Sequence, residues 1–144
     1  MAELVYTRVH RASPDLLFDC MTQPEHLTCF WGPSGTTTPI DGIVVDLRPG
    51  GAFETTMVND SDGNRYVMRA VYVEVDRPHR LVFTERGSGM TTTITFADLG
   101  DGRAEVTTHQ TDVPEAYASP QAQAGFRTSL DRFAAYLASI GEAR

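Results

Sequence analysis

The stretch GFRTSLDRFAAYLASIG, residues 125–141, decides the fold. Its large apolar side chains recur at spacings of four, three, four and three residues: Phe126, Leu130, Phe133, Leu137 and Ile140. This periodicity predicts one apolar stripe along a helix of about 20 residues. Ser119-Pro120 provides a cap and a first-turn proline before the stripe, and Gly141 ends it. Arg127, Asp131 and Arg132 lie off the stripe and are expected to face water.

The sequence before this helix alternates apolar and polar residues, and turn signals such as Asp62-Gly63 recur along it. This pattern is typical of an antiparallel meander. The predicted strands are Leu4–Val9, Ile43–Leu47, Phe53–Met57, Tyr66–Val75, Leu81–Glu85, Thr91–Leu99 and Ala104–Thr111.

Two short helices are expected after the first strand. Ser13-Pro14 offers a cap followed by a first-turn proline, so a helix is predicted over Pro14–Thr22. Pro24 ends it and begins a second short helix that runs toward Phe30-Trp31. Together these elements predict an α+β fold in one domain, residues 1–144, with a curved antiparallel sheet of about six to seven strands around the long C-terminal helix.

This arrangement predicts a cavity. A helix is only about 10 Å wide with its side chains, so it cannot cover a broad twisted sheet. The sheet must curl around the helix, and space opens where the two diverge. Three of the side chains expected to face inward are threonines, Thr55, Thr92 and Thr108. Hydroxyls in a closed core need partners, so a wet or ligand-filled cavity is favoured over the alternative that these threonines are exposed.

Composition narrows the classes of function. The chain of 144 residues has a net charge of −7 and no run of basic residues, which excludes nucleic-acid binding as the main role. No apolar stretch is long enough to cross a bilayer, so membrane insertion is not expected. Two cysteines are too few for a disulfide framework, and we expect a cytoplasmic protein, either a monomer or a homodimer.

Several segments, in the order expected, resemble the SRPBCC (START/Bet v 1-like) superfamily. The chain is most similar to its bacterial branch named for the activator of a heat-shock-chaperone ATPase. The matching segments are Ala12-Ser13-Pro14, Thr22–Leu27, Phe30–Pro33, Asp46–Gly51, Arg77–Phe83, Gly125-Phe126 and Ser129–Phe133. The family often has two tryptophans where this chain has Phe30-Trp31, and Gly-Trp where it has Gly125-Phe126. Both changes keep an aromatic side chain, so they affect the shape of a pocket rather than the fold.

The resemblance implies the helix-grip fold and a hydrophobic cavity, but no particular reaction. We expect the cavity to bind a small hydrophobic or amphipathic molecule. The alternatives are a chaperone-regulating interaction module and a polyketide cyclase/hydrolase-like enzyme. The predicted cavity residues are Phe30, Trp31, Phe53, Thr55, Met57, Met68, Phe83, Thr92, Ile94, Thr108, Phe126 and Leu130.

The sequence contains no defined catalytic group, and it predicts no metal and no cofactor. Its four histidines are far apart and lack the spacing of metal ligands. Glu85 could be a carboxyl group in the pocket, although we expect it in water at the end of its strand. For the enzyme alternative, Glu85 or Tyr66 would donate the proton. Trp31 could line the mouth of the pocket or plug the space between the short helices and the sheet.

Overall fold

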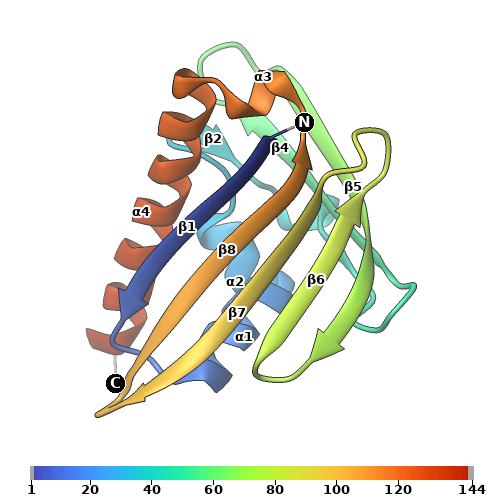
Figure 1. Ribbon diagram of the computed structural model, residues 1–144. Helices are drawn as coiled ribbons and strands as arrows, with labels where there is room; N and C mark the ends of the chain where they lie inside the picture. The colour runs from blue at the N-terminus through green and yellow to red at the C-terminus, as the bar shows by residue number, and fades with distance from the viewer. Residues whose placement is uncertain (1, 143–144) are drawn as a thin grey trace.

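An antiparallel sheet of eight strands bends around the C-terminal helix in the computed structural model, which describes residues 2–142 (Figure 1). The strand order is β1-β8-β7-β6-β5-β4-β2, and the short β3 pairs with β4. The strands are β1 (Ala2–His10), β2 (Thr36–Thr37), β3 (Val44–Val45), β4 (Ala52–Asn59), β5 (Arg65–Asp76), β6 (Arg80–Glu85), β7 (Thr91–Gly100) and β8 (Arg103–Val113).

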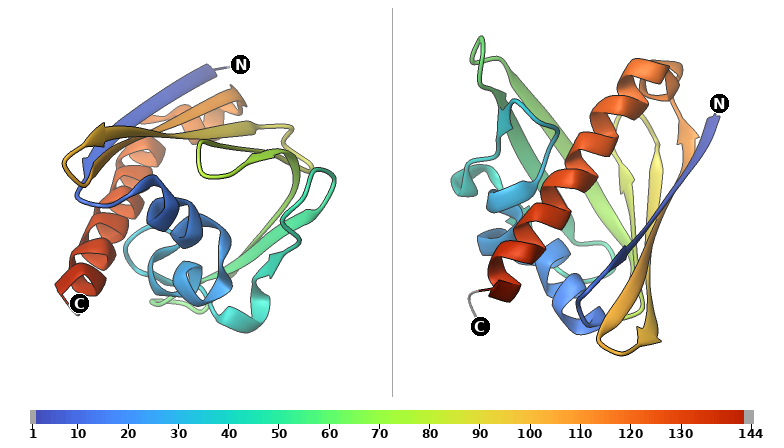
Figure 2. Two further views of the ribbon diagram at one scale, coloured as in Figure 1. Left: turned by 90° about the horizontal axis from the view of Figure 1, so that it is seen from below. Right: turned by 90° about the vertical axis from the view of Figure 1, so that its left-hand side faces the viewer.

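The helices lie on the concave side of this sheet. They are α1 (Pro14–Thr22), α2 (Pro24–Phe30), the 3-10 turn η1 (Ile40–Gly42), α3 (Glu115–Ala118) and α4 (Pro120–Glu142). Figure 2 shows α1 and α2 near the C-terminal end of α4, and α3 at its opposite end. The predicted α+β helix-grip architecture is thus confirmed. The expected domain includes residues 1 and 143–144, which lie outside the described part of the chain.

The ends of α1 follow from its local sequence. The Leu16 N–H donates to the Ser13 side chain at 3.2 Å, so Ser13 caps the helix as predicted. Pro24 then starts α2 one residue after the Gln23 cap. Both helices bury apolar side chains, among them Leu17, Phe18 and Leu27, none of which is exposed.

Two details of the sheet differ from the prediction. The strand expected over Ile43–Leu47 is only Val44–Val45, because the chain enters the turn at Arg48, whose N–H donates to the Asp46 carbonyl. The two-residue strand β2 was not predicted. In β5 a register shift between Tyr72 and Glu74 leaves Val73 as an extra residue opposite β6. Such a bulge bends a strand, which helps the sheet to curve.

The stripe along α4 is divided between two environments. Phe133 and Leu137 are buried in the core with side chains of α1, α2 and the sheet. Phe126 and Leu130 are only half-buried and face the space between helix and sheet. Arg132 was expected to face water, but in the structure it contacts the loop after α2. Its Nη1 donates to the carbonyls of Gly32 and Pro33 at 2.8 and 3.0 Å, so it fastens α4 to the loop after α2.

Candidate functional site

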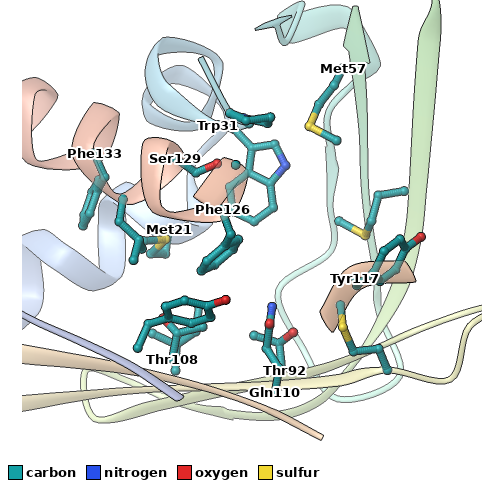
Figure 3. A pocket seen from close by; sticks show the side chains of 18 of the residues that line it. Met21, Trp31, Met57, Thr92, Thr108, Gln110, Tyr117, Phe126, Ser129 and Phe133 are labelled. Carbon is teal, nitrogen blue, oxygen red and sulfur yellow. The ribbon is translucent and has the colours of Figure 1, made fainter. Parts of the chain in front are cut away.

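A cavity of about 420 Å³ lies between the concave face of the sheet and the N-terminal half of α4 (Figure 3). Volumes of this order are typical of small-molecule sites. Apolar and aromatic side chains supply most of its wall, including Met21, Met57, Met68, Met90 and Phe126. The cavity exists because α1 and α2 fill only one end of the groove, while α4 alone spans the rest (Figure 2).

The structure brings together all of the predicted cavity residues except Phe53 and Thr55. Both do face the concave side and are buried, but Trp31 lies between them and the cavity. The Trp31 indole N–H donates to Thr55 Oγ1 at 3.1 Å, and the Trp31 ring meets the Phe53 ring edge-on at 5.4 Å between centroids. Trp31 therefore serves both roles considered for it: one side lines the cavity, and the other covers the core.

Four polar side chains form a continuous row on the sheet floor. Tyr6 of β1 pairs with Thr108 of β8, and Thr92 of β7 pairs with Gln110 of β8. Thr108 and Gln110 are two residues apart on one strand, so they point to the same face. We call Tyr6, Thr92, Thr108 and Gln110 the polar row; all four line the cavity, and Figure 3 shows Thr92 and Gln110 next to each other, with Thr108 further along the sheet.

Glu85 was expected in water at the end of its strand, but it lies in the wall of the cavity. It follows Leu81 and Phe83 at the two-residue spacing of the inner face of β6, so it still faces the cavity at the last residue of the strand. Burial raises the pKa of its carboxyl group, and a hydrogen bond with Ser88 offsets part of that rise. Among the described residues, Glu85 is the one acidic or basic side chain of the wall.

Tyr66 does not reach the cavity. Its side chain is 51% exposed, and it lies outside the set of lining residues. Of the two proton donors considered for the enzyme alternative, only Glu85 is thus placed where a bound molecule could meet it. Within residues 2–142, no three His, Cys, Asp or Glu side chains gather in a way that could hold a metal ion.

Several wall residues were missed by sequence reasoning. Gln110 follows Thr108 at the two-residue spacing of one strand face, so the signal was present and unused. Tyr117 gave no signal, because α3 is a single turn without periodicity. The other missed residues are Tyr6, Met21, Gly32, Pro33, Met90, Ala122, Gly125, Ser129 and Phe133.

The cavity meets solvent near α3. Tyr117 lines the cavity and is also 48% exposed, so it marks the opening. The polar row is deeper, since each of its side chains is at least nine-tenths buried. A molecule entering beside Tyr117 would thus meet apolar side chains first and polar ones on the floor.

No helix within residues 2–142 combines the length and the apolar character needed to cross a membrane.

Comparison with known proteins places this architecture in a family. The sequence model of the family described as "Activator of Hsp90 ATPase homolog 1-like protein" matches residues 11–138. No curated protein matches the chain.

Among solved structures, a protein from Chromobacterium violaceum, CV1439, is similar with a TM-score of 0.82 and 27% identity, covering 94% of this chain and 96% of its own. The AHSA1 protein of Silicibacter pomeroyi is similar with a TM-score of 0.83 and 26% identity, covering 95% of this chain and 98% of its own. The match begins just after β1 and includes α1, α2, strands β2 to β8 and most of α4, so the chain belongs to the family of activator of Hsp90 ATPase homolog 1-like proteins.

Proposed function

We propose that this protein binds one small apolar or amphipathic molecule in the cavity and performs no reaction on it. The observation that carries the proposal is the wall itself: a space of about 420 Å³ bounded mainly by methionine and aromatic side chains. An unfilled apolar space leaves its wall without contacts, so a molecule that fills it would stabilise the fold. Flexible methionines adapt to ligands of different shape.

The test is a thermal-shift and native mass spectrometry screen of apolar and amphipathic molecules, run on protein purified from its own host. Binding to the native state raises the melting temperature with ligand concentration. A co-purified mass or a concentration-dependent shift would support the proposal. The absence of both would contradict it.

Gly125 offers a matched control. It lies in the cavity wall on α4, and a Cβ added there would meet no atom within 4 Å. Gly125→Trp should fill the cavity and abolish ligand-induced stabilisation. Gly125→Ala should keep the response and raise stability by about 0.5–1 kcal/mol, since alanine favours helix more than glycine. An unchanged ligand response in Gly125→Trp would place the binding site elsewhere.

A second candidate is contact with a chaperone, which the family description favours. We propose it as an activity of the outer surface, independent of the cavity. Titration of an Hsp90-type chaperone with this protein, with ATP hydrolysis as readout, tests it. An unchanged rate together with no complex in size-exclusion chromatography would exclude it.

The reducing cytoplasm is our proposed compartment, because two cysteines do not form a disulfide framework.

A further inference from the structure

The polar row has hydrogen-bonding groups that the protein does not use. Tyr6, Thr92, Thr108 and Gln110 are 9%, 4%, 5% and 8% exposed. Among the residues that the structure describes, none of the four side chains has a hydrogen-bond partner, and the Tyr6 hydroxyl is fully buried. Buried polar groups in folded proteins are nearly always paired. The row lines the cavity, so a molecule bound there could supply the missing partners.

The row offers both donors and acceptors. Each hydroxyl can donate and accept, and the Gln110 amide provides both kinds of group. Because burial raises the pKa of Tyr6, its hydroxyl stays protonated and neutral. Two ligand groups match this set: a carbonyl oxygen, which accepts hydrogen bonds, and a hydroxyl, which both donates and accepts them.

The charges around the cavity disfavour anions. No Lys, Arg or His among the described residues lines the wall, and the sole charged group there is the carboxyl of Glu85. Arg127 places its guanidinium carbon 5.9 Å from the centre of the Tyr6 ring, but its side chain is exposed and outside the wall. A carboxylate or phosphate would thus lose its hydration with no buried counter-charge, which is costly.

We propose that the cavity selects an uncharged ligand with a hydroxyl or carbonyl group, which bonds to the polar row while its apolar body lies among the methionines and aromatic rings. Carboxylates of the same shape, such as fatty or aromatic acids, are rejected. This inference rests on the proposed function and adds the chemical class of the ligand.

Isothermal titration with matched probes tests it at neutral pH. Two scaffolds, naphthalene and biphenyl, are each used as the parent hydrocarbon, the phenol and the carboxylic acid. We expect the phenol to bind on the order of tenfold more tightly than its parent, and the acid to bind more weakly than the phenol by at least that factor. A carboxylic acid that binds as tightly as its phenol overturns the inference.

Substitutions locate the contact. Gln110→Leu and Tyr6→Phe should each weaken phenol binding several-fold and leave the parent hydrocarbon unaffected. Thr92→Val should act in the same direction, whereas Thr93→Val, one residue along β7 on the outer face, should not. Tyr6→Phe loses only a hydroxyl, so it keeps the test valid if Gln110→Leu misfolds.

The outcomes separate the two proposals. Equal binding of phenol and hydrocarbon, unchanged by these substitutions, overturns the polar-row inference but supports the binding function. No binding of any probe on either scaffold contradicts both.

Discussion

At the scale of single residues, Glu85 links the cavity to pH. Its folded-state pKa is raised by burial, so the folded protein holds the proton more tightly than the unfolded chain does. Stability from this group is therefore fully present below the ordinary pKa of a glutamate and is lost as pH rises through the raised value. Above the ordinary glutamate pKa this group therefore disfavours the folded state, because a charged carboxylate is costly to hold in the half-buried wall.

Glu85→Gln should consequently raise the melting temperature at neutral pH. The difference from the wild type should shrink below about pH 4, where the wild-type carboxyl is protonated in both states. Melting curves across pH check this, with Glu105→Gln as a control on the outer face of β8. A variant that is less stable than the wild type at neutral pH would contradict the burial argument.

The hydroxyl of Thr55 has a hydrogen-bond partner within the described part of the protein, unlike the hydroxyls of Thr92 and Thr108 in the polar row. It is fully buried and accepts the Trp31 N–H. Thr55→Val keeps the shape but leaves that N–H unpaired, so we expect a loss of about 1–3 kcal/mol in unfolding free energy. Urea denaturation measures it. Thr56→Val, on the opposite face of β4, should change stability by less than about 0.5 kcal/mol; equal losses in the two variants would refute the pairing argument.

Which threonine is structural could not be read from the sequence. Alternation correctly predicted that Thr55, Thr92 and Thr108 face inward. The reach of the Trp31 ring over β4 depends on how the loop after α2 docks, a tertiary relation without a local signal. Glu85 was misplaced for a similar reason, since the end of a strand in sequence need not be its solvent-exposed end.

At the scale of elements, α4 was the most predictable part of the molecule. Its apolar stripe is long and regular, so periodicity identified it and its start. The elements β2, η1 and α3 are too short to have a period, and none of them was predicted. The half-buried state of Phe126 and Leu130 also has no sequence signal, because their spacing is that of the core residues further along the helix.

Arg132 joins two of these elements. Its hydrogen bonds to the Gly32 and Pro33 carbonyls hold the loop that forms part of the cavity wall. Arg132→Met keeps the apolar stem and removes the donors, so we expect a loss of about 1–3 kcal/mol. Hydrogen exchange should also accelerate at residues 31–36. Arg127→Met, on the exposed side of the same helix, should leave that loop unchanged. Unaltered exchange in Arg132→Met would show that the loop is held by other contacts.

At the scale of the whole molecule, the order of elements was sufficient to predict the curved sheet, the helix within it and the space between them. The physical reason is that a single helix cannot cover so wide a sheet. The polarity of the floor was less predictable, since it depends on how β1 registers against β8 and brings Tyr6 beside Thr108.

The two halves of α4 are held to the rest of the fold to different degrees. Phe133 and Leu137 anchor its C-terminal half in the core, whereas Phe126 and Leu130 rest against a space. We therefore expect the N-terminal half and α3 to move outward more readily than the C-terminal half, which would let a molecule enter and leave the cavity while the core stays intact. Amide exchange should then be faster over residues 120–130 than over 131–140, and a bound molecule should slow the first segment most. Uniform protection along the helix would mean that the cavity exchanges its contents by a different route.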